Sequence, residues 1–516
     1  MGEHEYVIVG AGSAGCVLAN RLSAEHDVLV LEAGGPDEKR EVSVPVAHPE
    51  LLETDLDWGF RSTPQPALND RRVYIAQGKT LGGSSSINAQ MYFRGHPADY
   101  EAWTAAGNEG WDYDAAMEYY ERLEDGEGHH YGTGGPQSVA RQDDPHPIST
   151  AFVEAATECG LRRTPCFNAR EIEGAGYIDV IQEGNQRHSA ADAFLKPALD
   201  RPTLTAETGA RVRRVTFDGD RATGVVYDQD GETKRATATG EVIVSAGAIN
   251  SPRLLLLSGV GPADHLRDHG VEVQADRPGV GRNLHDHVVV WINYEAETSA
   301  TYDDADSLVN LLKYVLLKRG PLMSNGTEAG GFWRSSPDLP APDVQFVFAP
   351  AYVERNGLAD PSGHGFSIGV GLVHPESRGR VALESGDPTD DPAIDPQYLA
   401  SDDDLTALVD GVAKAREIAE SDALDEYRAG RNWPRGDGEA AVRDHVRENA
   451  QSYFHLVGSC RMGDDETAVV DDRLRVHGVE GLRVVDASVM PTITRGNTHA
   501  PTLMIAERAA DLIAGT

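Results

Sequence analysis

The chain has 516 residues, with 83 acidic against 46 basic side chains, a formal net charge of −37, and 40% apolar residues. This composition excludes a disordered chain and suits two or three interleaved domains around sizeable cores. The charge repels nucleic-acid phosphates and anionic lipid headgroups, so we expect neither as a partner. An acidic surface with only seven lysines favours a salt-loving organism, although GC-rich codon usage would also leave an excess of arginine.

Targeting signals and cysteines point to one compartment. The N-terminus has no basic leader and runs directly into a strand and a glycine turn, so we expect neither a signal nor a transit peptide. The longest apolar stretches, including 308–317, are shorter than the ~18 residues that a membrane span needs. The four cysteines spell out no disulfide or metal framework. A cytoplasmic protein without a stable membrane anchor is therefore expected.

The first 35 residues have the pattern of one βαβ unit. Apolar runs at 6–9 and 28–31 predict two strands, and helical spacing over 16–24 predicts the helix between them. A G-x-G-x-x-G turn over 10–15 stands between the first strand and the helix. This order of elements is typical of a dinucleotide-binding unit.

Each residue of this turn has its own physical role. Gly10 permits the tight turn, Gly12 lets the backbone approach a pyrophosphate, and Gly15 allows close packing of helix on strand. The helix N-terminus at Ser13 supplies N–H donors to the phosphates. Glu32 ends the second strand, where a carboxylate can accept a hydrogen bond from an adenosine ribose. The unit therefore predicts an ADP-containing dinucleotide, either FAD or NAD.

Later segments predict further strands and helices. A small antiparallel sheet that leads back to the main one is expected from 211–217, 223–228 and 241–245. A second sheet that walls off a pocket is expected from 287–294, 343–349, 365–373 and 379–383. Helical spacing occupies 112–124, 304–318, 402–420 and 501–514. The acidic segments 387–391 and 401–404 are expected to be solvated loops.

Seven separated motifs stand in the order of one known family. They include GKTLGGSSSINAQMYFRGHPAD at 78–99, GAINSPRLLLLSGVG at 247–261, VGRNLHDH at 280–287 and HLVGSCRMG at 455–463. With them the whole chain resembles the glucose-methanol-choline (GMC) family of FAD-dependent oxidoreductases, in its choline dehydrogenase-like and alcohol dehydrogenase-like branch. The resemblance implies an α/β fold with a Rossmann-like FAD-binding domain, and a second, α+β substrate domain on an antiparallel sheet. The FAD-binding domain would comprise 1–144, 187–286 and 453–516, and the substrate domain 145–186 and 287–452.

The resemblance also implies a flavin site. Gly82 and Gly83 would let the backbone lie against the flavin ring, and Ser84 and Asn88 would form hydrogen bonds with the flavin. Ile87 stands where members that bind FAD covalently often carry a histidine. We therefore expect non-covalent FAD. The expected cofactor-binding residues are Gly10, Gly12, Ser13, Gly15, Glu32, Gly82, Gly83, Ser84, Asn88, Val212, Ala246, Gly247, Asp486 and Thr498.

The reaction that the resemblance implies is oxidation of an alcohol to an aldehyde or ketone, by proton abstraction and hydride transfer to flavin N5. The hydroxyl needs a proton acceptor with a pKa near neutrality, and His455 matches the family's active-site histidine. Asn497 matches a position where members carry Asn or a second His, and would hold the substrate oxygen. His499 is a weaker alternative as a second catalytic group. The helix after Pro501 would aim its positive N-terminus at the flavin N1–C2=O edge.

Several alternatives stay open. No metal is expected, because His285 and His287 lack a third ligand at a recognisable spacing. A non-redox lyase of the hydroxynitrile lyase type that keeps FAD, and a binding protein that uses FAD as a scaffold, remain alternative functions. The segment 346–348 is expected to form one pocket wall, and Val347, near a histidine position of choline-oxidising relatives, favours a less polar alcohol than choline. The alcohol, the oligomeric state and the electron acceptor (oxygen, a quinone or another carrier) stay open.

Overall fold

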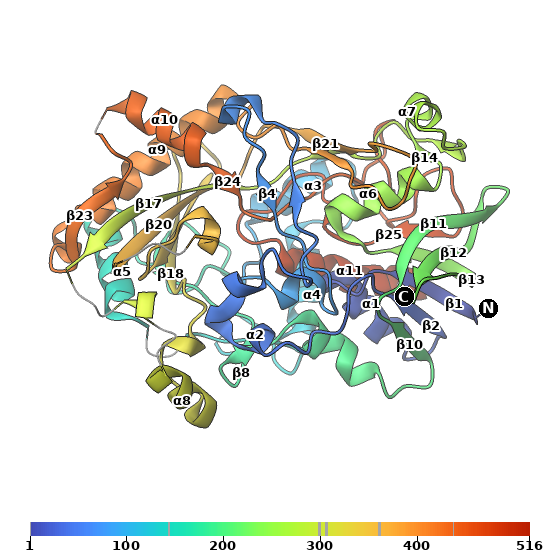
Figure 1. Cartoon of the computed structure of the whole chain (residues 1–516), viewed down its shortest axis with the longest axis horizontal. Coiled ribbons are helices and arrows are strands. Elements are labelled where there is room, and N and C mark those ends of the chain that lie inside the picture. The colour runs from blue at the N-terminus through green and yellow to red at the C-terminus, as the bar shows by residue number, and fades with distance from the viewer. Residues whose placement is uncertain are drawn as a thin grey trace.

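The computed structural model describes residues 2–128, 130–142, 145–297, 301–304, 308–359, 363–436 and 438–515. Two seven-stranded sheets lie toward opposite ends of the molecule, with helices and loops between and around them (Figure 1). The first sheet takes its strands from three stretches of the chain, 2–31, 204–244 and 482–484. The chain therefore returns to this sheet twice. The expected limits of the two domains stay a prediction.

The first sheet is the expected Rossmann-like sheet, in the order β10-β2-β1-β13-β12-β11 with β25 beside β13. Its strands are β1 (Gly2–Val9), β2 (Val28–Leu31), β10 (Leu204–Glu207), β11 (Arg211–Asp218), β12 (Arg221–Gln229), β13 (Glu232–Val244) and β25 (Leu482–Val484). The pairs of β1 with β2 and β13 are parallel, and those of β12 with β11 and β13 are antiparallel. The antiparallel strands expected over 211–245 are present as β11, β12 and β13. They extend the main sheet directly, because β13 is 13 residues long and pairs with both β12 and β1.

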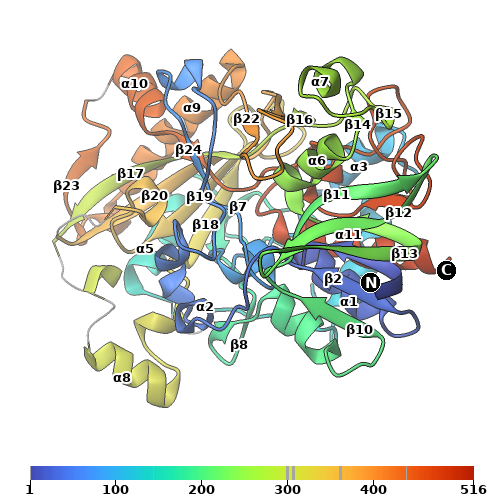
Figure 2. The same cartoon turned by 45° about the vertical axis from the view of Figure 1, so that its right-hand side comes forward.

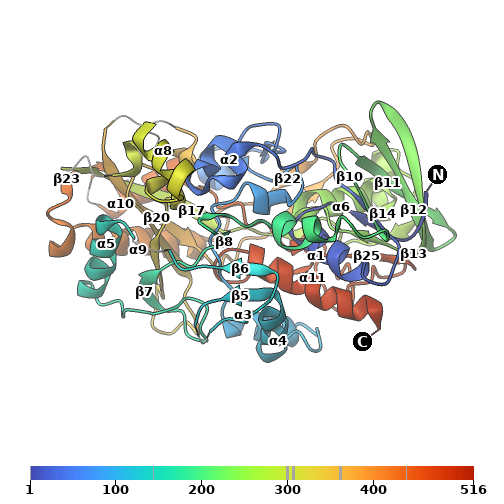
Figure 3. The same ribbon diagram turned by 90° about the horizontal axis from the view of Figure 1, so that it is seen from below.

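Burial explains the apolar runs of β1 and β2. Val7, Ile8 and Val30 are 0% exposed, as expected for parallel strands that are covered on both faces. The expected βαβ unit is completed by α1 (Ser13–Leu22). The last helix, α11 (His499–Ala514), packs against α1, and Figure 3 shows the two helices side by side. The first and last helices of the chain thus meet next to the first glycine turn.

The second sheet is antiparallel, in the order β23-β17-β20-β19-β18-β7 with β24 beside β17. Its strands are β7 (Gly174–Tyr177), β17 (Val288–Ala296), β18 (Ala329–Trp333), β19 (Val344–Ala349), β20 (Gly365–Leu372), β23 (Arg428–Trp433) and β24 (Gln451–Ser452). Three helices pack on this sheet: α5 (Pro147–Glu158), α9 (Asp402–Ala419) and α10 (Glu439–Asn449). Figure 2 shows α9 and α10 beside it. Phe348, Phe366 and Val370 belong to the core that these elements share.

The strand expected at 379–383 does not join the second sheet. It is β21 (Gly379–Ala382), which pairs with β16 (Arg282–Leu284) and β22 (Ala393–Asp395) in a three-stranded sheet. Short strand pairs are β3 (Phe60–Arg61) with β4 (Tyr74–Ile75), β5 (Glu124–Gly126) with β6 (Gln137–Val139), β8 (Gln182–Glu183) with β9 (Gln186–Arg187), and β14 (Val260–Gly261) with β15 (Ala275–Asp276). The other helices are α2 (Arg40–Ser43), α3 (Pro97–Ala105), α4 (Tyr113–Leu123), α6 (Gly247–Leu257), α7 (Ala263–Asp268) and α8 (Leu308–Leu317).

The expected helices are present with small shifts. They correspond to α4, α8, α9 and α11; part of the predicted 304–318 segment, residues 305–307, lies outside the described residues. The acidic segment 401–404 is not a solvated loop, because it starts α9. Ser401 accepts the Asp403 N–H at 3.3 Å as the helix cap. Asp404 is 2% exposed and accepts the N–H of Ser377 at 2.9 Å.

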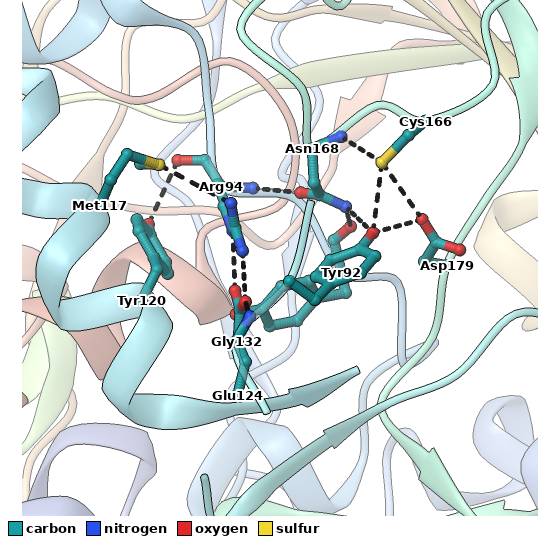
Figure 4. Close-up of polar contacts among 10 residues, drawn as sticks. Tyr92, Arg94, Met117, Tyr120, Glu124, Gly132, Cys166, Asn168 and Asp179 are labelled. Atoms are coloured by element: carbon teal, nitrogen blue, oxygen red, sulfur yellow. Dashed lines mark hydrogen bonds and ion pairs between the residues drawn. The ribbon is translucent and has the colours of Figure 1, made fainter. Parts of the chain in front are cut away.

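A buried polar network joins three chain segments (Figure 4). Glu124 forms an ion pair with Arg94, with Nε and Oε1 2.7 Å apart, and also accepts the Tyr92 hydroxyl at 2.6 Å and the Gly132 N–H at 3.1 Å. Asn168 accepts the Arg94 N–H at 2.8 Å and donates to the Tyr92 carbonyl at 3.0 Å. The network therefore ties the segment 92–94 to both 124–132 and 168.

Candidate active site

A cavity of about 710 Å³ is lined by residues of both large sheets. At one end it reaches Val9 and Leu31, the last residues of β1 and β2. At the other end it reaches Trp291 of β17 and Ala349 of β19. Ligands of parallel α/β sheets bind at the carboxyl ends of the strands. This cavity therefore lies where a dinucleotide is expected, and continues to the second sheet.

Three helices begin at the cavity wall. Ser13 opens α1, Gly247 opens α6, and Thr498 directly precedes α11; all three residues line the cavity. The first turn of each helix has backbone N–H groups without helical partners and about half a positive charge. These three N-termini together favour a ligand with anionic groups.

The glycine turns bring backbone close to backbone. Gly10 has a φ of +100°, which other residues rarely adopt. A Cβ on Gly83 would lie 2.7 Å from the Cα of Gly12, so the two glycine-rich turns are in contact. Neither Gly15 nor Gly82 lines the cavity, although both are among the expected cofactor residues. A Cβ at either position would clash within the turns, so these two glycines serve packing.

Glu32 sits at the strand end where the sequence places it. Its Oε2 accepts the Ala11 N–H at 2.9 Å and its Oε1 accepts the Gly34 N–H at 2.8 Å. Burial raises the pKa of this carboxyl. Each carboxylate oxygen can accept a second hydrogen bond, and Glu32 lines the cavity together with Val212 and Ala246. The expected adenosine end of the cofactor site is therefore assembled in one place.

Asp486 is held by three donors at the start of α6. It accepts the Gly247 N–H at 2.9 Å, the Ser251 hydroxyl at 2.5 Å and the Ser488 N–H at 2.8 Å. Burial raises its pKa, because the charged form loses water. Its position at a helix N-terminus favours the carboxylate. Asp486 lines the cavity and is 3% exposed, so this side chain does not face solvent.

The segment 84–88 forms another part of the wall. Ser84, Ile87 and Asn88 line the cavity, and Ile87 is 3% exposed. Behind them, Arg187 donates to Asn88 Oδ1 at 2.8 Å and to the Ser85 carbonyl at 3.0 Å. Burial lowers the pKa of Arg187 to about 9. No motif points to Arg187, since nothing in the neighbouring residues predicts a buried cation there.

His455 is 8% exposed and lines the same cavity. Its backbone N–H donates to Asp286 Oδ1 at 2.8 Å, and its Nδ1 lies 3.0 Å from Nδ1 of His287. The Tyr453 ring lies over it, with ring centroids 4.7 Å apart. Burial lowers the pKa of His455 to about 3, so the imidazole is neutral at pH 7. This is below the near-neutral pKa expected for the base, because burial disfavours the charged ring.

Asn497 and His499, which are two positions apart in the sequence, both line the cavity. The Asn497 Oδ1 and the His499 Nε2 are buried and have no hydrogen-bond partner among the described residues. The other nitrogen of His499, Nδ1, lies 2.9 Å from the Ser13 hydroxyl. Burial lowers the pKa of His499 to about 4. Both atoms without partners are therefore free to bond to a ligand.

The pocket wall expected at 346–348 is wrong. Phe346 and Phe348 pack into the core shared with α5 and α9, and Val347 packs into a different cluster with Phe332. None of the three lines the cavity, whose wall at the second sheet is formed instead by Met91, Asn325, Thr327, Trp291, Ala351, Tyr352, Val353, Asn356, Tyr453 and Phe454. No motif predicts Tyr453 as a wall residue. Its hydroxyl is buried and has no partner among the described residues.

Models of the GMC oxidoreductase family match residues 4–289 and 375–506. The chain belongs to this family. This GMC oxidoreductase is 41% identical over 529 residues to an alcohol dehydrogenase [acceptor] of Pseudomonas putida, covering 99% of this chain and 95% of that one. It is 39% identical over 528 residues to an oxygen-dependent choline dehydrogenase of Brucella ovis, covering 99% and 96%. The crystal structure of pyridoxine 4-oxidase from Mesorbium loti matches with a TM-score of 0.92, 32% identity and 99% of both chains.

FAD is implied for this GMC oxidoreductase by its family, and the cavity residues fit it. The N–H groups at three helix N-termini can bind a pyrophosphate, and the Glu32 carboxylate can accept a hydrogen bond from a ribose hydroxyl. The buried Ser245 Oγ, Asn497 Oδ1 and His499 Nε2 lack partners within the described part of the chain, so the wall has unsatisfied groups for a polar ligand. The described part of the chain contains no group of three or more His, Cys, Asp or Glu side chains that could hold a metal ion. No helix in the described ranges is long and apolar enough to cross a bilayer.

Proposed function

We propose that this protein oxidises an uncharged alcohol to the aldehyde or ketone, with FAD bound non-covalently. The observation that carries this proposal is that His455 and Asn497 line one cavity together with the N-terminus of α11. A neutral imidazole, an amide oxygen without a partner and a helix N-terminus supply a proton acceptor, a positioning group and a positive field. The printed activities of the alcohol dehydrogenase, choline dehydrogenase and pyridoxine oxidase relatives support an alcohol as the substrate class.

His455 accepts the hydroxyl proton in this proposal. Burial keeps the ring neutral at physiological pH, so one ring nitrogen has a lone pair that can accept the proton. Asn497 holds the substrate oxygen, and such positioning can contribute several kcal/mol, roughly 7 or more in favourable cases. The N-terminus of α11 stabilises negative charge that develops beside it. When bound, FAD supplies the acceptor for the hydride and its two electrons.

The acidic side chains on the wall belong to the cofactor part or accept backbone N–H groups, so they do not call for a cationic substrate. Among the described residues that line the cavity, the acidic side chains are Glu32, Asp303 and Asp486. Glu32 and Asp486 belong to the cofactor part, and Asp303 accepts the backbone N–H groups of Tyr352 at 2.9 Å and Gly365 at 3.0 Å. The wall near Trp291 is otherwise apolar or neutral. We therefore propose a less polar alcohol than choline.

An anaerobic panel of alcohols tests the activity. The flavin absorbance should bleach with aliphatic or aromatic alcohols, and His455→Gln should slow this bleaching about 10²–10⁴-fold. His130→Gln, at an exposed position, is the matched control and should leave the rate unchanged. The proposal fails if no alcohol bleaches the wild-type flavin or if His455→Gln reacts as fast. Cleavage of a cyanohydrin without bleaching would favour the lyase alternative.

The mode of FAD binding has a separate test. Ile87 lines the cavity and has no nucleophilic atom, so the yellow colour should leave the polypeptide completely on denaturation and filtration. Flavin fluorescence that remains with the denatured chain in a gel would contradict this part of the proposal. Re-oxidation of the alcohol-reduced enzyme by air and by an artificial dye then separates oxidase from dehydrogenase.

A further inference from the structure

Helix α8 turns apolar side chains outward. The described chain has six exposed large apolar residues, and five of them belong to this helix: Val309, Leu312, Val315, Leu316 and Leu317, each 50–74% exposed. Positions 309, 312 and 316 follow helical spacing, so they share one face. Figures 1 and 2 show α8 at the lower edge of the molecule. An exposed apolar patch of this kind is typical of an interaction surface.

The opposite face of α8 is fixed to the rest of the protein. Tyr314 is 2% exposed, and its hydroxyl lies 3.3 Å from the Ser43 carbonyl and 3.2 Å from the Asn185 carbonyl, as a donor to both. Its ring belongs to a small apolar cluster with Val44, Ala47 and Leu322. The helix is therefore held in place by one face while the other stays open.

The cluster beneath α8 also borders the cavity. Val46 and Tyr302 pack against this cluster, and both line the cavity wall. His48 and Pro49, which follow Val46 in the same short 3₁₀ helix, line that wall as well. Whatever binds the outer face of α8 therefore lies close to one wall of the candidate active site.

The charge beside α8 is opposite in sign to the charge of the whole chain. Residues 308–319 include Lys313, Lys318 and Arg319 and no acidic residue, whereas the chain has 83 acidic and 46 basic residues. Lys313 and Arg319 are exposed, and the Lys318 ammonium lies 4.6 Å from the centre of the Tyr314 ring. Repulsion by distant carboxylates is largely screened beyond about 10 Å at 0.1 M salt. The surface at α8 therefore complements an anionic partner.

A lipid surface suits this combination better than a second copy of the chain. Two α8 helices face to face would bring like charges together, between molecules that each carry a charge of −37. With ten residues, α8 is too short to cross a bilayer but long enough to lie along its surface. Helices that do so bury an apolar face among the acyl chains and keep Lys and Arg at the headgroups.

We infer that α8 docks the protein on a lipid surface with anionic headgroups. Val309, Leu312 and Leu316 enter the apolar layer, and Lys313 and Arg319 contact the headgroups. Binding is peripheral and reversible, because a single short helix buries little apolar area. The inference goes beyond the proposed function and does not depend on it, since the docking surface is separate from the cavity.

Cosedimentation with vesicles tests the inference. The FAD-bound full chain is mixed with vesicles of phosphatidylcholine alone, or of phosphatidylcholine with phosphatidylglycerol. We expect binding to the anionic vesicles and a partition coefficient at least about tenfold lower for Leu312→Gln/Leu316→Gln. Lys313→Gln/Arg319→Gln should lower it at least about fivefold. In about 1 M KCl the charge variant should approach the wild type, whereas the apolar variant should stay weaker.

Matched variants at other exposed positions are the controls. Leu199→Gln makes the same apolar change at the exposed leucine outside α8, and Arg235→Gln/Arg380→Gln removes two exposed cations from β13 and β21. Both should bind vesicles like the wild type. FAD content and Tm should be unchanged in all variants, because every altered side chain is exposed. No binding by the wild type, equal binding to both vesicles, or an apolar α8 variant that binds like Leu199→Gln would overturn the inference.

Two further measurements identify what contacts the helix. The fluorescence of Leu316→Trp should be quenched by bromine-labelled lipids beyond the quenching of the wild type, and that of Leu199→Trp should not. Equal quenching in both variants would overturn the inference. Light scattering without lipid should give a monomer mass. A dimer that Leu312→Gln/Leu316→Gln disperses, without vesicle binding, would show that a second copy covers α8 and would also overturn the inference.

Discussion

The Ser13 hydroxyl and Nδ1 of His499 lie 2.9 Å apart, although the two residues are 486 positions apart in the sequence. Each is the first residue of a helix, Ser13 of α1 and His499 of α11. The contact joins two helix N-termini at the cavity wall, and the second ring nitrogen of His499 is left without a partner among the described residues. His499 therefore links the glycine turn to the cavity, which suits a role in holding the cofactor.

His499→Ala should weaken FAD binding more than it affects chemistry. Loss of one hydrogen bond of about 1.4 kcal/mol would raise the Kd for FAD roughly tenfold. Titration of the FAD-depleted protein, followed by flavin fluorescence, measures this change. At saturating FAD, the pH profile of flavin reduction should be the same as for the wild type. A shifted profile would instead make His499 the second catalytic group.

Asp486→Ala should destabilise the protein even without FAD. The substitution leaves the Gly247 N–H, the Ser251 hydroxyl and the Ser488 N–H without their acceptor. Hydrogen bonds to a charged group contribute about 1.5–3 kcal/mol, so we expect a loss of about 3 kcal/mol in the free energy of unfolding. Urea unfolding of the FAD-depleted protein measures it. Asp268→Ala, at an exposed position, is the control, and equal losses in both variants would contradict the prediction.

Glu124→Gln should break the buried network of Figure 4. The neutral amide leaves the Arg94 guanidinium without a counter-charge, since the ion pair is closed to solvent. Removal of one partner of a buried pair costs about 3–5 kcal/mol. The unfolding midpoint in urea should fall accordingly, while Glu121→Gln, an exposed change on α4, should have little effect. A midpoint for Glu124→Gln close to that of the control would show that the pair contributes little.

Stability should fall below pH 6.5, and His455 and His499 are two of the buried histidines that contribute to this loss. Their pKa values in the folded state, about 3 and about 4, are below the ordinary value of 6.5. Only the unfolded chain takes up these protons between pH 6.5 and about 4, so folding loses about 2 kcal/mol per histidine from pH 7 to pH 5. Asp286, with a folded pKa of about 6, acts in the opposite direction. The double variant His455→Gln/His499→Asn should therefore lose less stability over this range than the wild type, as measured by urea unfolding at each pH.

Salt should raise the melting temperature if the acidic surface is an adaptation to high ionic strength. A net charge of −37 repels itself, and salt shortens the range of that repulsion from about 10 Å at 0.1 M to about 3 Å at 1 M. A melting series in KCl, followed by circular dichroism, measures the effect. No gain between low and molar KCl would favour codon usage as the origin of the arginine excess.

Local patterns predicted the parts of the fold that depend on neighbours in the sequence. β1, α1 and β2 were predictable because their apolar runs and the glycine turn are contiguous. Strand partners were not, since pairing depends on distant segments: β13 continues through both parts of the first sheet, and β21 pairs with β16 and β22. Helices α3 and α5 were not predicted. They begin at Pro97 and Pro147, and a proline is also a common turn residue.

In the candidate site too, residues within motifs were predicted and contacts between distant segments were not. Glu32, His455 and Asn497 stand in motifs, and the structure places all three on one cavity wall. No motif predicts the contact of His287 with His455, because the two residues are 168 positions apart in the sequence. The error at 346–348 arose because both faces of β19 pack into apolar clusters and only its last residue, Ala349, lines the cavity; sequence alone does not say which part of a strand borders a cavity.

The cavity wall is completed by the end of the chain. Glu32 and the first glycine turn are translated long before β25, Asn497 and α11, which line or border the same cavity. A nascent chain that has finished β13 still lacks the edge strand and the helix that close the wall around the flavin. Stable FAD binding is therefore expected only after the chain has been translated through α11. A product shortened by its last 35 or so residues would be colourless however well its earlier portions fold.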